Sequence, residues 1–274
     1  MRISSSTTDM IKLVISDIDG TLVPDGSGEG ALNEEYFRQI ERLCDKGVRF
    51  VACSGRQFMS MYKLMRPVAD KIYFACEGGG YICDGDRNVL YKQVLDPETV
   101  IEIVHDAKKI PQLDIMVAGL KQSYCRSRDS ELYRWLVNGY GFDIEAVGDL
   151  EAGVDDDVTK VSLYHKDAAE ALTKDSFRPK WEKRVKTILA GKQWLDCVSM
   201  QSGKGNAVAF LQDYLNVTKD ETVIFGDNEN DIEMFAYAGT SYAVKNAREE
   251  VKLAADEVCG EMLDDGVLKV LKTI

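Results

Sequence analysis

The stretch that decides the fold is Lys12-Leu13-Val14-Ile15-Ser16-Asp17-Ile18-Asp19-Gly20-Thr21-Leu22. An apolar run that ends in two carboxylates and a glycine is typical of a buried strand that carries acidic groups to the edge of a sheet. Residues two apart on extended backbone point to the same side, so Asp17 and Asp19 are expected to converge. Two such carboxylates repel each other unless one is protonated or a cation lies between them, and a hard divalent ion such as Mg²⁺ suits them. Taken alone, the stretch also fits a strand followed by an acidic turn.

Composition narrows the class of protein. The chain has 274 residues, which is long enough for two domains, and its 46 acidic and 34 basic residues leave a net charge of −12. This charge disfavours nucleic acid and anionic membranes as partners. Seven cysteines without C-x-x-C spacing indicate reduced thiols in a cytoplasmic protein. No apolar run reaches the ~18 residues of a membrane span, and the polar residues 1–9 predict a disordered tail.

Strands and helices alternate regularly on both sides of a middle segment in which their order is mixed. Strands are predicted at 12–16, 48–53, 72–76, 222–225, 242–244 and 257–258, with helices at 33–46, 57–66, 203–215, 232–238, 247–254 and 266–271. This alternation predicts a doubly wound, mainly parallel, Rossmann-like α/β core formed by residues 10–83 and 195–274. Residues 84–194 mix strands at 114–118, 123–126, 158–164 and 185–189 with helices at 98–108, 130–138 and 166–172. We therefore expect an inserted α+β cap domain with an antiparallel sheet.

Polar residues follow several of the predicted strands of the core. Asp17, Ser54 and Asp227 come at strand ends, and Lys204 opens a helix. Parallel packing would gather these side chains at the carboxyl edge of one sheet. An acid pair, a hydroxyl, a cation and a second acid cluster are the groups that phosphoryl transfer requires. Taken alone, Ser54 fits a turn serine and Lys204 a solvated lysine, and it is their order between two acidic motifs that favours a functional role.

Four segments resemble motifs of the haloacid dehalogenase (HAD) superfamily. They are D-x-D-G-T-L at 17–22, S-G-R at 54–56, K-G-N at 204–206 and G-D-N-E-N-D at 226–231. In this order the chain resembles the Cof-type (subfamily IIB) phosphatases, which carry a large cap between the second and third motifs. The resemblance spans essentially the whole chain. It implies a Mg²⁺-dependent phosphomonoester hydrolase that acts through an aspartyl-phosphate on sugar phosphates or similar small metabolites.

The resemblance also implies a role for each matching residue. Asp17 would be the nucleophile, and Asp19 would protonate the leaving group and later activate water. Mg²⁺ would be held by the Asp17 carboxylate, the Asp19 backbone carbonyl and the Asp227 carboxylate. Asp231 would orient metal-bound water and Lys204. The phosphate would be held by the amides of Ile18 and Gly55 and the side chains of Ser54, Lys204 and Asn230.

Several points stay open in the sequence. The family often has asparagine-glycine after the third strand, where this chain has Glu77-Gly78, so an asparagine contact there is in doubt. Arg56 fits either a substrate ligand or a structural ion pair. Candidates for recognising the leaving group are the cap residues Lys121, Tyr124, Arg126, Lys160 and Lys192. A phosphomutase or phosphotransferase would use the same aspartate pair, and a phosphate-accepting regulatory module fits the length less well. We expect a monomer or a weak homodimer.

Overall fold

The computed structural model describes residues 11–167, 169–190 and 193–274, so the predicted tail at 1–9 and Lys192 lie outside the described residues. The chain divides into two compact units, which we call the core unit (residues 1–91 and 203–274) and the inserted unit (residues 92–202). The inserted unit thus begins at 92 instead of 84 and ends at 202 instead of 194, eight residues later at each end than predicted. Each unit is described by itself.

Two pairs of strands explain these shifted limits. The hairpin of β4 (Tyr81–Asp84) and β5 (Val89–Lys92) extends the core sheet, because β4 pairs antiparallel with β3 (Tyr73–Cys76). At the other limit, the sequence analysis missed β11 (Trp194–Val198), which pairs with two strands of the inserted unit. Both boundaries are set by which strands pair through hydrogen bonds. This pairing cannot be inferred from a change in the local sequence pattern.

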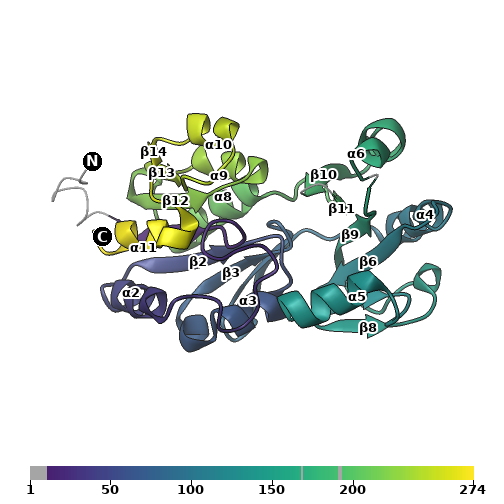
Figure 1. Ribbon diagram of the computed structural model, residues 1–274, viewed down its shortest axis with the longest axis horizontal. Helices are drawn as coiled ribbons and strands as arrows, with labels where there is room; N and C mark the ends of the chain where they lie inside the picture. The colour runs from purple at the N-terminus through teal and green to yellow at the C-terminus, as the bar shows by residue number, and fades with distance from the viewer. Residues whose placement is uncertain (1–10, 168, 191–192) are drawn as a thin grey trace. The chain divides into compact units, whose positions relative to one another are not determined.

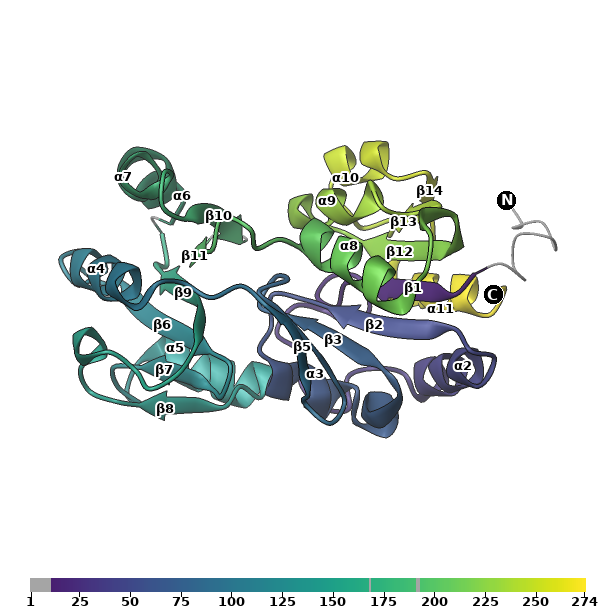
Figure 2. The same cartoon turned by 180° about the vertical axis from the view of Figure 1, so that it is seen from behind.

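The core unit is built on one eight-stranded sheet in the order β14-β13-β12-β1-β2-β3-β4-β5 (Figures 1 and 2). The further strands of this sheet are β1 (Leu13–Ser16), β2 (Arg49–Cys53), β12 (Thr222–Gly226), β13 (Thr240–Ala243) and β14 (Glu257–Val258). All neighbours from β14 to β3 run parallel. The doubly wound α/β fold predicted from the sequence is confirmed.

Helices cover both faces of this sheet. α2 and α3 pack against β2 and β3, while α9 and α10 pack against β12 and β13, with α8 beside α9 (Figure 2). The helices are α2 (Glu34–Asp45), α3 (Phe58–Leu64), α8 (Lys204–Leu215), α9 (Ile232–Phe235), α10 (Glu249–Ala254) and α11 (Gly266–Leu271). Asn33 caps α2 by accepting a hydrogen bond from Glu35 N, as its position before Glu34-Glu35 predicts.

The central strand β1 is buried throughout its length. Leu13, Val14 and Ile15 are fully buried, and the strand pairs with β12 on one side and β2 on the other. A parallel strand that is covered on both faces needs a continuous apolar run, which this segment provides. The run ends at Ser16, and the acidic groups that follow emerge at the carboxyl edge of the sheet.

The inserted unit has a six-stranded sheet in the order β10-β11-β9-β6-β7-β8. Its strands are β6 (Asp114–Gly119), β7 (Ser123–Cys125), β8 (Ile144–Ala146), β9 (Val158–Tyr164) and β10 (Lys186–Ala190), together with β11. Its α-helices are α4 (Pro97–Ala107), α5 (Glu131–Trp135), α6 (Ala169–Leu172) and α7 (Arg178–Trp181). The strand pairs are antiparallel except β7 with β8. This agrees with the predicted α+β character of the segment.

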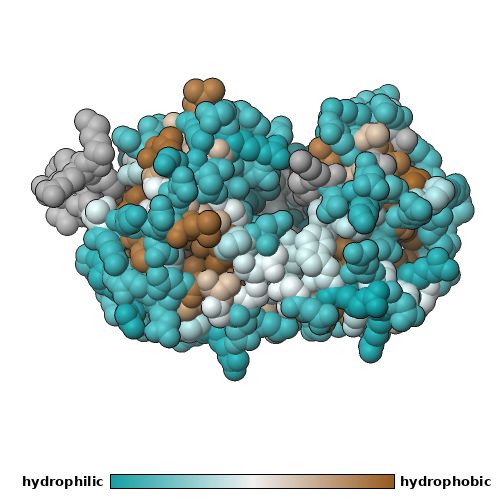
Figure 3. Space-filling view, viewed as in Figure 1, coloured by the Kyte–Doolittle hydropathy of each residue, from teal (hydrophilic) through white to brown (hydrophobic). Residues whose placement is uncertain are grey.

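The surface is largely hydrophilic on the face that Figure 3 shows, where hydrophobic residues form small, separate patches. Among the described residues, the exposed large apolar side chains are Val89, Val94, Ile101, Met200, Tyr214, Leu253, Val258 and Leu263. Within the described part of the chain, none of the helices is both long and apolar enough to span a bilayer.

Candidate active site

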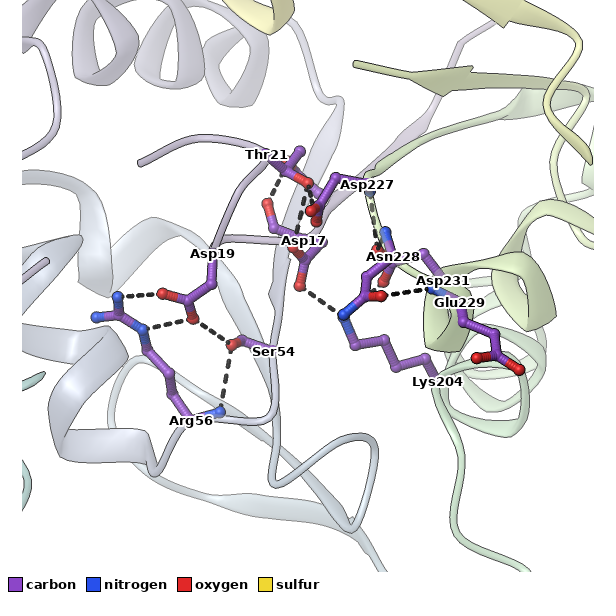
Figure 4. A network of polar contacts seen from close by, with 11 residues as sticks. Asp17, Asp19, Thr21, Ser54, Arg56, Lys204, Asp227, Asn228, Glu229 and Asp231 are labelled. Carbon is purple, nitrogen blue, oxygen red and sulfur yellow. Dashed lines mark hydrogen bonds and ion pairs between the residues drawn. The ribbon is translucent and has the colours of Figure 1, made fainter. Parts of the chain in front are cut away.

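Three chain segments converge where β1, β2 and β12 end. In the parallel register Ser16 lies beside Ala52 of β2 and beside Phe225 of β12. Asp17, Ser54 and Asp227 therefore leave neighbouring strands at the same edge of the sheet, as predicted. Figure 4 shows their side chains gathered there.

Lys204 joins the two acidic motifs. It is the first residue of α8, and its Nζ lies 2.6 Å from Asp17 Oδ1 and 2.6 Å from Asp231 Oδ1. All three side chains are buried. Burial alone would lower the pKa of Lys204, but the carboxylates of Asp17 and Asp231 outweigh it and raise that pKa well above its usual value. The ammonium is therefore a fixed positive charge beside Asp17.

Asp231 organises the loop after β12. Its Oδ2 accepts hydrogen bonds from the backbone N of Asp227 at 2.9 Å and of Asn228 at 3.0 Å, while its Oδ1 contacts Lys204. Both carboxylate oxygens are thus engaged by this protein's own donors. The side chain fixes the backbone that carries Asp227 and holds the Lys204 ammonium in place.

Thr21 is a site residue that the sequence analysis did not single out. It is fully buried, and its Oγ1 lies 3.1 Å from both Asp17 Oδ2 and Asp227 Oδ1. The hydroxyl therefore links carboxylates that are 210 residues apart in the chain (17 and 227). Its place in D-x-D-G-T-L was the signal that could have identified it.

Gly20 allows this close approach. Its φ is +81°, and a Cβ built at this position would lie 2.3 Å from Asp227 Oδ2. Any larger residue would have to displace Asp227 and would also adopt a strained backbone conformation. The glycine is therefore required by the contact between the two acidic loops.

Asp19 points away from this cluster. Figure 4 shows its side chain directed toward Arg56, whereas Asp17 is directed toward Lys204. Asp19 Oδ2 accepts from Arg56 Nε at 2.8 Å and from Ser54 Oγ at 3.3 Å, and Asp19 Oδ1 accepts from Arg56 Nη2 at 2.5 Å. Of the two interpretations left open for Arg56, the structure shows an ion pair, and the arginine side chain is only 2% exposed.

The other predicted phosphate ligands occupy different settings. Ile18 is fully buried, and its carbonyl oxygen accepts hydrogen bonds from the amides of Thr21, Leu22 and Val23. Gly55 is exposed in the turn after β2. Asn230 is half-buried, and its Oδ1 has no hydrogen-bond partner among the residues that the structure describes.

The loop Glu77–Gly80 packs on the S-G-R turn. Glu77 N donates to Arg56 O at 3.0 Å, and Gly78 N donates to Ser54 O at 2.9 Å. Glu77 has a φ of +53° and is 1% exposed. The backbone of this loop therefore supports the turn, whatever side chain stands at position 77.

Three of the predicted recognition residues of the inserted unit contact oxygen atoms of aspartates in the same unit. Tyr124 Oη lies 3.1 Å from Asp156 Oδ2, and Lys160 Nζ lies 3.5 Å from Asp196 Oδ2. Lys121 Nζ lies 2.5 Å from the carbonyl oxygen of Asp155, and Arg126 is exposed. Tyr124 and Lys160 are buried, and their partners Asp156 and Asp196 are partly buried.

The acidic cluster has the chemistry of a divalent-cation site. One carboxylate oxygen each from Asp17, Asp227 and Asp231 lies within 4.8 Å of the others. Burial, followed by the negative charge of Asp231, raises the pKa of Asp17 well above its usual value and that of Asp227 to about 6. Crowded oxygen donors of this kind fit Mg²⁺, which would relieve their repulsion. All three aspartates belong to this candidate cluster, and the Asp231 carboxylate is the one that two backbone amides hold in place.

Comparison with known proteins gives the family. The model of the haloacid dehalogenase-like hydrolases matches residues 14–271. The chain therefore belongs to this family and is an enzyme that acts on phosphate esters. One curated relative is the 5-amino-6-(5-phospho-D-ribitylamino)uracil phosphatase YbjI of Escherichia coli (strain K12), which is 25% identical over 264 residues and covers 96% of each chain.

Solved structures agree with this assignment. A crystal structure of a protein from Eubacterium rectale has a TM-score of 0.87 and 38% identity, and the match covers 96% of this chain and 99% of that one. The HAD subclass IIB sugar phosphatase BT4131 has a TM-score of 0.78 at 20% identity, covering 95% and 98% of the two chains, which shows a shared fold. The resemblance to the haloacid dehalogenase superfamily found in the sequence is confirmed.

Proposed function

We propose that the protein is a Mg²⁺-dependent phosphomonoester hydrolase that forms an aspartyl-phosphate on Asp17 and acts on sugar phosphates or similar small metabolites. The observation that carries the proposal is the placement of Asp17. Its carboxylate is buried, paired with Lys204 at 2.6 Å and grouped with the carboxylates of Asp227 and Asp231. A nucleophile for a phosphate ester needs such a positive neighbour, because the substrate is itself anionic.

In the proposed reaction, an Asp17 carboxylate oxygen attacks phosphorus while the bond from phosphorus to the leaving oxygen breaks. Asp19 gives a proton to that oxygen, so the product is a neutral alcohol. In the second step Asp19 takes a proton from the water that attacks phosphorus, which frees Asp17 and releases inorganic phosphate. Lys204 compensates the charge on the phosphoryl oxygens throughout.

Asp17, Asp227 and the backbone carbonyl of Asp19 would hold the magnesium ion, which supplies positive charge between nucleophile and phosphate when bound. The Thr21 hydroxyl contacts Asp17 and Asp227 and so keeps their carboxylates close together for this purpose. Asp231 holds the loop that carries Asp227. Phosphate contacts from Ser54, Asn230 and the amides of Ile18 and Gly55 are part of the same proposal. Asn230 would take part through its amide nitrogen Nδ2, because only a donor can hydrogen-bond to a phosphoryl oxygen.

The test is release of inorganic phosphate from a panel of phosphorylated sugars, polyols and nucleotides, with and without Mg²⁺. The panel includes 5-amino-6-(5-phospho-D-ribitylamino)uracil, the compound in the name of the Escherichia coli relative. We expect release that needs Mg²⁺ and is lost in Asp17→Asn, which hardly changes side-chain volume. The exposed Asp25→Asn variant is the control and should behave as wild type. An isomerised sugar phosphate without free phosphate would indicate a phosphomutase instead.

A cytoplasmic location and a monomeric or weakly dimeric state complete the proposal. All seven cysteines are free, which suits a reducing compartment. Light scattering coupled to gel filtration measures the mass in solution, and a stable tetramer would contradict this part of the proposal.

A further inference from the structure

Arg56 is a buried cation that the proposed reaction does not use. It follows β2 in the S-G-R turn, and its side chain is 2% exposed. Its guanidinium donates to both oxygens of Asp19, from Nε at 2.8 Å and from Nη2 at 2.5 Å. Nη1 donates to the carbonyl oxygen of Ser27 at 2.7 Å and to Ser60 Oγ at 3.3 Å.

This arrangement constrains Asp19 in two ways. A bidentate arginine–carboxylate pair fixes the plane of the carboxylate as well as its position. Ser54 adds a hydrogen bond to the same oxygen that Arg56 Nε contacts, and Ser54 Oγ in turn accepts from Arg56 N at 3.2 Å. The Asp19 side chain is 22% exposed while the arginine is buried, so the carboxylate lies at the rim and the guanidinium supports it from inside.

The same guanidinium reaches the loop between Asp19 and α2. Ser27 lies in Pro24-Asp25-Gly26-Ser27-Gly28, a segment rich in turn residues. Its carbonyl oxygen is held by Nη1 of the arginine whose other nitrogens hold Asp19. The direction of the Asp19 carboxylate and the position of this loop are therefore set by one planar group.

We propose that Arg56 is a positioning residue that sets the direction of the Asp19 carboxylate and joins it to the loop at Ser27. The inference rests on the proposed function, in which Asp19 protonates the leaving oxygen. Lysine cannot replace arginine here, because an ammonium group lacks the planar fork that contacts both carboxylate oxygens and the Ser27 carbonyl together. Loss of the fork leaves the proton donor present but misdirected.

A leaving-group comparison separates this role from a general structural one. p-Nitrophenyl phosphate releases a stable anion and needs little protonation, whereas an alkyl phosphomonoester such as glycerol phosphate releases a basic alkoxide and needs it strongly. For Arg56→Lys we expect kcat/KM to fall on the order of 100-fold with the alkyl ester, the cost of a misplaced catalytic group. With the nitrophenyl ester it should stay near the wild-type value. An equal loss on both esters overturns the proposal.

The matched control is Arg66→Gln. Arg66 also contacts the loop, through Glu29 at 3.3 Å, but it is 70% exposed and does not touch Asp19. It should leave both activities unchanged. A selective loss on the alkyl ester in Arg66→Gln would show that any loosening of the loop has this effect, and would overturn the assignment to Arg56.

A second measurement uses Asp19→Asn. If Arg56 acts through Asp19, adding Arg56→Lys to Asp19→Asn changes alkyl-ester hydrolysis little, because the two changes remove the same step. Full additivity contradicts the proposal. If Arg56→Lys does not fold, Ser60→Ala is tested instead, because it removes one partner of the guanidinium. It should give the same selective loss on a smaller scale. An equal loss on both esters again overturns the proposal. Failure of the proposed function is distinguishable, since Asp17→Asn would then keep wild-type turnover.

Discussion

Replacement of Thr21 by valine removes a hydroxyl while the shape of the side chain is kept. In the structure this hydroxyl lies 3.1 Å from Asp17 Oδ2 and 3.1 Å from Asp227 Oδ1, and the residue is fully buried. No water has access to restore the lost contact from the Thr21 side. The two carboxylates then depend on their own loops, on the contact of Asp17 with Lys204 and on the backbone of Asp227 that Asp231 supports.

The size of the effect follows from the kind of bond. A hydrogen bond to a charged group contributes roughly 1.5–3 kcal/mol, and each ~1.4 kcal/mol is tenfold in rate. If the bond is needed equally in the transition state, kcat/KM falls roughly 10- to 150-fold in Thr21→Val. The concentration of Mg²⁺ that gives half-maximal activity should rise as well, because both proposed metal ligands lose their common partner.

The assay is phosphate release over a range of Mg²⁺ concentrations, with circular dichroism to compare the folded state of the variants. Thr21→Ser is the matched control. It keeps the hydroxyl and loses one buried methyl group, so most of the activity should remain. Unchanged kinetics in Thr21→Val, or a loss in Thr21→Ser as large as that in Thr21→Val, would refute the role given to this hydroxyl.

Three further predictions concern the same cluster. Gly20→Ala should abolish measurable turnover in a folded protein, because its Cβ would lie 2.3 Å from Asp227 Oδ2; wild-type kinetics would contradict this. Lys204→Met should lower the free energy of unfolding by about 3–5 kcal/mol, because the substitution leaves buried carboxylates unpaired. The double variant Lys204→Met with Asp231→Asn should recover part of this loss. A urea titration measures both. The pKa of Asp227 is raised from 3.8 to about 6, so its contribution to the stability of the metal-free protein is present below about pH 4 and lost as the pH rises through about 6. The unfolding free energy of the wild type relative to Asp227→Asn should therefore fall by roughly 3 kcal/mol between pH 4 and pH 7. Mg²⁺ should reverse this fall. A difference between the two proteins that does not change with pH would contradict the prediction.

The sequence predicted which residues form the site better than it predicted where their side chains point. Asp17, Lys204 and Asp227 meet as expected, because parallel strands bring their carboxyl ends to one edge whatever the details of the loops. Asp19 was expected to converge with Asp17 from the two-residue period of a strand. The strand ends at Ser16, however, and the turn that follows directs Asp19 to Arg56 instead.

Contacts between distant segments account for the other differences. Asn246 donates to Gly20 O at 2.8 Å and accepts from Met262 N at 2.9 Å, so it braces the first acidic loop from the far end of the chain. Its local sequence contains no motif that indicates this. The strand β11 was missed for a similar reason, since Trp194–Val198 gains its partners from β9 and β10 of the inserted unit.

The central claim is that Asp17 takes the phosphoryl group. The most direct measurement is to mix the protein, Mg²⁺ and a phosphomonoester that it hydrolyses, stop the reaction within its first turnover, reduce the mixture with borohydride and locate the reduced residue by tandem mass spectrometry. The account predicts homoserine at position 17, increased in Asp19→Asn if that change slows hydrolysis of the acyl phosphate, and absent in Asp17→Asn. Phosphate release by a protein in which another residue carries the label, or in which Asp17→Asn still turns over, would contradict it.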